Sequence, residues 1–151
     1  MISRPKRIEC NMYTKLKCLS LNASSNLLMT LGLDSKNRDL IVIWDLAGES
    51  PQIMARQISP FDITTIKFSP LHDFRLISCG KENIRFWRIK NDHIPGASVV
   101  LNSHARTSNF TDLEFSMVDT ETGPSCQILA GSQNGNLFVI GYESKVIEDV
   151  F

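Results

Sequence analysis

Hydrophobic positions along the chain follow one short pattern that occurs three times. In each case an apolar residue is followed by two residues, a second apolar residue, one residue and a third apolar residue. The three segments begin at residues 16, 63 and 110, so both intervals are 47 residues, and they read LKCLSL, ITTIKF and FTDLEF. Equal intervals between matching patterns indicate an internal repeat, in which each unit supplies one supersecondary structure.

Two further apolar segments follow the first one in every unit. The second segments end in small residues and span 27–32, 75–80 and 127–132. The third segments hold the large apolar side chains and span 40–46, 83–89 and 136–142. Alignment of the second segments puts small residues in two shared positions, which are Thr30, Ser78 and Ala130, and Gly32, Gly80 and Ser132. Small side chains there would let neighbouring strands approach closely.

Each unit is therefore predicted to form four short antiparallel strands, and the predicted fold class is all-β. The fourth segments are the least regular, at 52–58, 97–102 and 145–151. Turn-forming residues separate the segments, and no stretch of ten residues has the periodicity of a helix. The predicted organisation is an N-terminal tail, or a strand of a preceding unit, at 1–14, followed by units at about 15–59, 60–103 and 104–151. The third unit is predicted to have the longest loop between its first two strands, at 116–126.

The repeat length, the KFSP that contains Phe68, and the IVIWDL that contains Trp44-Asp45 resemble WD40 repeats. This resemblance implies a β-propeller in which each unit is one four-stranded blade. The motif weakens along the chain, because the second unit has Trp87-Arg88 in place of Trp-Asp and the third has Ile140-Gly141. Further residues occupy repeat positions that are structural by this resemblance, namely Gly32, Ser78, Gly80, His104 and Phe115.

The units depart from the WD40 pattern at their polar positions. The Gly-His pair that usually precedes the first strand is absent from all three units, and the third keeps only His104. The usual aspartate before the third strand is replaced by Glu82 and Asn134 in the later units, while Asp34 could fill the position in the first. We therefore expect the hydrogen-bond network of the repeat to be incomplete, and apolar packing to hold the blades together.

The second and third units are also similar to a narrower group. LISCGKENIRFWRIK, LNSHARTSNFTDLEF and GNLFVIGYESKVI resemble the WD-repeat region of a family of large centriolar and ciliary proteins. LGLDSKNRDLIVIWD also resembles blades of the echinoderm microtubule-associated-protein-like family. Both resemblances imply a cytoplasmic role in a microtubule-linked assembly, with centriolar or microtubule-associated proteins as partners.

Composition excludes several classes of function. Sixteen basic residues balance sixteen acidic ones, and a neutral domain lacks the field that attracts proteins to nucleic acid. No apolar run is long enough to span a membrane. The four cysteines form no CxxC pair, and no histidine stands beside them at the spacing of metal ligands. No catalytic motif accompanies the three histidines, so we expect no enzymatic activity, no cofactor and no metal.

The aromatic and basic residues of the third strands have two readings each. Trp44 and Trp87 could be binding-surface aromatics, but their position in the third strand favours core packing. Arg85, Arg88 and Lys90 could form an ordinary solvated strand face, or a small basic stripe that faces an acidic partner.

Three blades are fewer than the four to eight that close a propeller. We therefore expect the open flanks to be covered by remaining blades of a longer parent chain. The predicted function is that of a non-enzymatic WD40 scaffold that binds other proteins. A general WD40 adaptor, such as a substrate receptor of a ubiquitin ligase or a trafficking-coat subunit, stays open, as does a catalytic propeller that uses His104 or Asp34.

Overall fold

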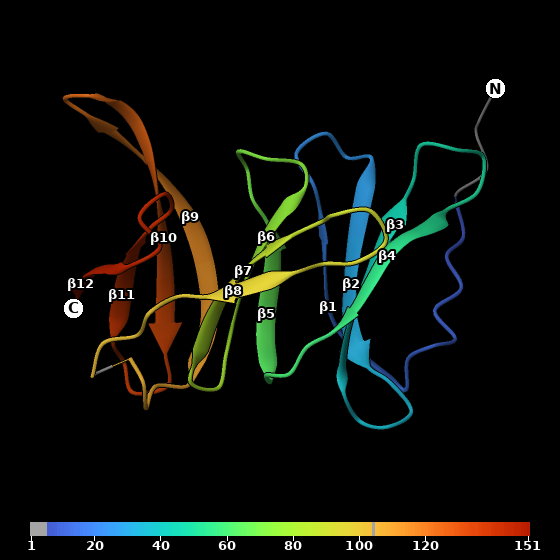
Figure 1. Ribbon diagram of the computed structural model, residues 1–151, viewed down its shortest axis with the longest axis horizontal. Coiled ribbons are helices and arrows are strands. Elements are labelled where there is room, and N and C mark those ends of the chain that lie inside the picture. The colour runs from blue at the N-terminus through green and yellow to red at the C-terminus, as the bar shows by residue number, and fades with distance from the viewer. Residues whose placement is uncertain (1–5, 104) are drawn as a thin grey trace.

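The computed structural model describes residues 6–103 and 105–151, and the regular elements in this part are β-strands. These strands form three four-stranded antiparallel sheets that stand side by side in an open arc (Figure 1). The predicted fold class is confirmed, and the sheets are named blades A, B and C in chain order. The described residues contain no helix that could cross a membrane.

Blade A holds the strands β1 (Lys15–Leu21), β2 (Leu27–Leu33), β3 (Asp39–Asp45) and β4 (Gln52–Ile58), in this order across the sheet. Its third strand is buried along nearly its whole length, because both faces of the sheet are covered there. A strand that is buried on both faces reads as a continuous apolar run rather than as an alternating one. The segment LIVIW follows this rule.

Blade B holds β5 (Ile63–Phe68), β6 (Arg75–Gly80), β7 (Asn83–Arg88) and β8 (Gly96–Ser98). The sequence predicts a fourth strand at 97–102, but β8 starts one residue earlier and ends after three residues. Beyond β8 the backbone N–H of Val99 still donates to the carbonyl of Ile84 in β7 at 2.9 Å, and the Val99 side chain, which is 4% exposed, packs into the core between blades B and C.

Blade C holds β9 (Phe110–Thr120), β10 (Gly123–Ser132), β11 (Leu137–Gly141) and β12 (Ile147–Val150). The prediction of a long loop at 116–126 is wrong.

β9 and β10 continue as one antiparallel hairpin to its tip, where Thr120 pairs with Gly123. Gly123 has a φ of 117°, which a residue without a side chain adopts without strain. Cross-strand backbone bonding extends this hairpin although both of its faces are largely exposed, so its side chains show no apolar pattern. A prediction from hydrophobic periodicity therefore reads it as a loop.

The core consists of two layers of apolar side chains, each lying between adjacent blades. The layer between blades A and B includes Met29, Leu31, Ile43, Ile66 and Leu76. The layer between blades B and C includes Ile77, Ile84, Phe110, Ile128 and Phe138. Each layer removes large apolar side chains from water, and each such side chain contributes about 1.5–3 kcal/mol of transfer free energy.

The outer face of blade A is covered by the segment before β1. Leu40, Val42 and Trp44 point to this face, and the side chains of Ile8 and Met12, among others, pack on them. In Figure 1 this segment runs beside β3 and β4 without regular secondary structure. We call residues 6–14 the N-terminal cover.

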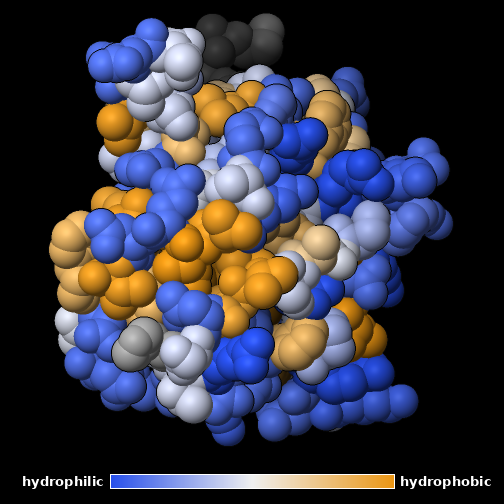
Figure 2. Space-filling view, turned by 60° about the vertical axis from the view of Figure 1, so that its left-hand side comes forward, coloured by the Kyte–Doolittle hydropathy of each residue, from blue (hydrophilic) through white to orange (hydrophobic). Residues whose placement is uncertain are grey.

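The outer face of blade C has no such cover among the described residues. Phe138 and Ile140 point into the core, so the alternation of β11 turns Leu137 and Val139 to the other side. Leu137 is 41% exposed. Figure 2, which brings this end of the molecule forward, shows hydrophobic side chains exposed over it.

Candidate functional site

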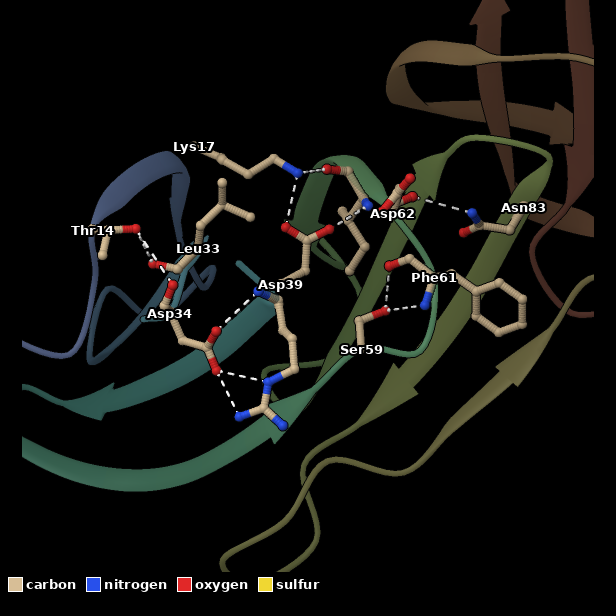
Figure 3. A network of polar contacts seen from close by, with 11 residues as sticks. Thr14, Lys17, Leu33, Asp34, Asp39, Ser59, Phe61, Asp62 and Asn83 are labelled. Carbon is tan, nitrogen blue, oxygen red and sulfur yellow. Dashed lines mark hydrogen bonds and ion pairs between the residues drawn. The ribbon is translucent and has the colours of Figure 1, made fainter. Parts of the chain in front are cut away.

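A buried carboxylate joins blade A to blade B. Asp39, which begins β3, is 6% exposed, and its Oδ2 accepts a hydrogen bond of 2.7 Å from the backbone N–H of Ile63 in β5. Its Oδ1 accepts a bond of 2.9 Å from Lys17 of β1, whose ammonium also donates to the carbonyl of Ile63 (Figure 3). One charged pair therefore ties together the first and third strands of blade A and the first strand of blade B.

Asp34, the aspartate that the sequence singles out, has a local role. Its carboxylate accepts bonds of 2.9 Å from the backbone N–H groups of Lys36 and Arg38, and it pairs with the Arg38 guanidinium at 2.8 Å. The backbone N–H of Arg38, followed by its side chain, holds the pKa of Asp34 below its usual value. These contacts shape the β2–β3 turn inside blade A, whereas Asp39, which sequence reasoning missed, contacts the next blade.

Two of the three blades retain a tryptophan that donates to a small hydroxyl residue. Trp87 Nε1 donates to Ser78 Oγ at 2.8 Å, and Trp44 Nε1 donates to Thr30 Oγ1 at 2.9 Å. Both rings are buried, at 3% and 5% exposure. In blade C the corresponding positions are Ala130 and Ile140, which leaves apolar packing alone.

Tyr13 of the N-terminal cover extends this arrangement in blade A. Its hydroxyl lies 2.9 Å from Thr30 Oγ1 and 3.0 Å from the Thr30 carbonyl oxygen. Burial raises the pKa of Tyr13 to about 12. The chain of contacts from Tyr13 through Thr30 to Trp44 fixes the N-terminal cover on the blade, and no motif in the sequence points to it.

Two glycines permit close approach at the ends of the second strands. A Cβ on Gly32 would collide with the carbonyl oxygen of Lys15, and a Cβ on Gly80 with that of Asp62. Neither collision can be relieved by moving a flexible side chain, because both involve backbone atoms.

The other predicted repeat positions lie in different surroundings. Phe68 is buried between blades A and B, and Phe115 packs partly buried against the layer between blades B and C. Asp45 accepts a hydrogen bond of 2.9 Å from the backbone N–H of Ala47 and so shapes the turn after β3. His104 lies outside the described residues.

The three predicted basic residues do not form one stripe. Arg85 shares a face of β7 with Trp87, and its guanidinium lies 4.9 Å from the ring centres of both Trp87 and Phe61. Burial lowers the pKa of Arg85. Arg88 points to the opposite face and is exposed, and Lys90 is exposed in the turn that follows. That these residues face a partner stays a prediction.

Blades B and C are also joined by polar contacts. Ser69 Oγ and Tyr142 Oη lie 2.7 Å apart, and both residues are almost fully buried. The ammonium of Lys67 in β5 donates to the carbonyl of Leu113 in β9 at 2.7 Å and pairs with Glu114 at 3.3 Å. These joints make the three blades a continuous unit.

The cysteine thiols are free in the described part of the chain. Burial raises the pKa of Cys79 to about 12, so this thiol is protonated at neutral pH and is a poor nucleophile. Within residues 6–103 and 105–151, no group of three histidine, cysteine or acidic side chains is placed to hold a metal ion.

Comparison with known sequences gives several relatives. The chain is 26% identical to WD repeat-containing protein 90 from Xenopus tropicalis over 138 residues, which is 87% of this chain and 7% of that protein. It is 25% identical to Centriole proteome protein 16 from Chlamydomonas reinhardtii over 157 residues, 90% of this chain and 8% of that protein. Echinoderm microtubule-associated protein-like 2 from Rattus norvegicus is 24% identical and covers 82% of this chain, which matches 18% of that protein. No family model matches the chain.

Comparison with solved structures identifies the fold. The β-propeller domain of Cps50 (Swd1) from Myceliophteria thermophila superposes with a TM-score of 0.66 at 13% sequence identity, and the match covers 90% of this chain and 41% of that one. At this identity the likeness concerns the fold alone. The chain therefore forms three blades of a WD40-type β-propeller and is similar in sequence to WD repeat-containing protein 90 and Centriole proteome protein 16.

Proposed function

We propose that the three blades are a non-enzymatic scaffold for protein interactions within a centriole- or cilium-associated, microtubule-linked assembly in the cytoplasm. The observation that carries this proposal is the extent of the sequence match. It runs over 87–90% of the chain in two relatives, one of which is named for the centriole proteome. The microtubule-associated relative supports the same direction with 82% coverage.

The open arc supports a further part of the proposal. The chain spans only 7–8% of the length of the first two relatives and 41% of the solved propeller chain. We propose that a further blade packs on the outer face of blade C and buries Leu137 there. A neighbouring blade fits this face because the two existing joints also bury apolar side chains from facing sheets.

The proposal is tested by localisation in ciliated cells. A tagged protein that carries residues 15–151 is compared with a version that lacks them and with an Ile77→Asp variant, whose charge falls in the layer between blades B and C. We expect the intact protein at centrioles, basal bodies or axonemes, and a clear loss of this signal in both altered forms. If the intact protein is absent from these structures, the centriolar assignment is wrong.

Affinity purification distinguishes the scaffold from the general WD40 adaptor. We expect centriolar or microtubule-associated proteins to co-purify with the intact chain and to be lost with Ile77→Asp. Recovery of ubiquitin-ligase or coat subunits without these proteins would favour the adaptor instead.

A further inference from the structure

A pocket of about 290 Å³ lies between blades B and C. Its lining comes from β6, β7, β8 and the turn after β11, and the residues are Arg75, Phe86, Trp87, Arg88, Pro95, Gly96, Ala97, Tyr142 and Lys145. The pocket therefore exists only where the two blades are docked. The sequence pattern, including the positions of the two tryptophans, does not predict this pocket.

Aromatic rings and backbone form the walls of this pocket. Phe86 and Tyr142 meet edge to face at 5.9 Å, and the bond from the Tyr142 hydroxyl to Ser69 holds this tyrosine in place. On the opposite face of the sheet Gly96 lies close to the Trp87 ring, where a Cβ would come within 2.7 Å of ring carbon Cε3, so β8 is held against β7. The apolar walls are thus rigid and are already in place without a ligand.

Three cations surround the pocket, and no acidic residue lines it. Arg75 and Arg88 are direct cross-strand partners in the β6–β7 ladder, an arrangement of like charges that destabilises a sheet. Lys145 stands over the Phe86 ring at 5.4 Å. In the described part of the chain none of the three forms a salt bridge.

This local excess of charge is unusual because the whole chain has a formal charge of zero. Arg38 and Lys67 pair with acidic residues of the chain itself, whereas other exposed cations, such as Lys15 and Lys36, form no salt bridge within the described residues and have no like charge directly opposite them. An anion bound between Arg75 and Arg88 would reduce the electrostatic repulsion between their guanidinium groups.

The edge of the sheet favours an extended peptide as that anion. β8 is the last strand of blade B and pairs on one side only, with β7. Gly96 and Ala97 are small, so a second backbone can approach this edge, as in recognition by strand addition. A free phosphate ion would use the cations but neither the edge nor the apolar walls.

We propose that this pocket, which we call the B–C pocket, binds an acidic peptide segment of a partner protein. Its carboxylates pair with Arg75, Arg88 and Lys145, and one apolar side chain packs beside Phe86 and Tyr142. This inference rests on the proposed scaffold function and adds the chemistry of the partner to it.

Binding is measured with the whole chain and a fluorescein-labelled peptide of alternating glutamate and valine. The pocket variant is Arg88→Glu with Lys145→Glu, and the matched control is Lys15→Glu with Lys36→Glu, which changes the net charge equally at exposed positions of blade A. We expect the pocket variant to weaken binding about tenfold or more and the control to weaken it less than twofold, since each exposed pair contributes a modest free energy. Equal losses in both variants would overturn the proposal.

Intrinsic fluorescence locates the peptide directly. The chain has two tryptophans, so Trp44→Phe leaves Trp87 as the single reporter; its residue borders the pocket, although its ring packs on the other face of β7. We expect the acidic peptide to change its emission and a lysine–valine peptide to leave it unchanged. A response to vesicles of anionic lipid or to inorganic phosphate, with none to the acidic peptide, would contradict the choice of ligand.

A third measurement does not depend on binding. Arg75→Gln removes one member of the like-charged pair, so we expect an unchanged or higher melting temperature together with weaker peptide binding. A clear loss of stability would show that Arg75 serves the fold, and would overturn its assignment to the pocket. If the peptide fails to bind while the protein still reaches centrioles, the assignment of a peptide site to the B–C pocket is wrong and the scaffold proposal stands. If the peptide binds and the protein does not reach centrioles, the centriolar assignment is wrong and the peptide site stands.

Discussion

The two ends of the arc present opposite faces of the same sheet architecture, and these two outer faces have different surroundings. On blade A the N-terminal cover packs over Trp44, which is 5% exposed. On blade C the counterpart of Trp44 is Ile140, which is buried against blade B, so the outer face is the opposite one; it carries Leu137, which is 41% exposed, and Val139, which is 9% exposed. Among the described residues, the outer face of blade A is therefore covered by another segment of the chain, and the outer face of blade C is exposed at Leu137.

The N-terminal cover shows how an irregular segment can pack on the outer face of a blade. Tyr13 reaches from an irregular segment and bonds Thr30, which in turn accepts from Trp44. A few residues without regular structure thus satisfy the polar groups and cover the apolar ones. Blade C has alanine and isoleucine at the positions of Thr30 and Trp44, and both side chains are buried in the layer between blades B and C, where the polar contact of blade A has no counterpart.

The largest expected effect comes from the covered face. Trp44→Ala removes a buried ring and should lower the free energy of unfolding by about 3–5 kcal/mol, whereas Leu137→Ala on the exposed face should cost less than about 1 kcal/mol. Urea denaturation of the two variants measures both values. Equal losses would show that the two faces are equally buried in solution.

A smaller effect is expected from the hydroxyl that anchors the N-terminal cover. Tyr13→Phe keeps the ring and removes the bonds to Thr30, which should cost about 1 kcal/mol. The same denaturation experiment applies, and amide hydrogen exchange of residues 8–13 should rise in the variant. Unchanged exchange would mean that ring packing alone holds the segment.

The pH dependence sharpens the same contact. Because the folded protein raises the pKa of Tyr13 to about 12, its contribution is fully present below the ordinary tyrosine value of about 10. This contribution to the free energy of unfolding should decrease as the pH rises from about 10 through 12. The unfolded chain loses the Tyr13 proton at a lower pH than the folded protein does, so deprotonation favours unfolding. Denaturation at pH 8 and pH 11 measures this, and Tyr13→Phe is the control that should lack this component. An identical pH response in both proteins would assign the effect to other groups.

The smallest effect on stability is expected at the exposed face of blade C. Leu137→Ser should change the free energy of unfolding by no more than about 0.5 kcal/mol, because the side chain loses little burial. Sedimentation velocity should show less self-association in the variant, since an exposed apolar patch favours association. A large loss of stability would mean that Leu137 is buried in solution.

Much of the fold could be predicted from local patterns. The spacing of apolar residues correctly places the first three strands of each blade, because burial of alternating or continuous apolar residues is recorded in the sequence itself. The fourth strand of blade A was also placed correctly at 52–58, whereas β8 and the β9–β10 hairpin were less accessible. β8 has only three residues, so it carries little periodic pattern, and the hairpin is held by backbone bonds that leave no side-chain pattern.

The sequence by itself determined the repeat, the all-β class and the tryptophan positions, since these depend on residue type and spacing along the chain. Only the tertiary structure decided which polar groups meet. Asp39 joins two blades, Tyr13 covers a blade face, and Arg88 lies beside Lys145 at a pocket, although each partner is distant in the sequence. Such contacts depend on how the blades pack against each other, and packing geometry is not encoded in any local period of the chain.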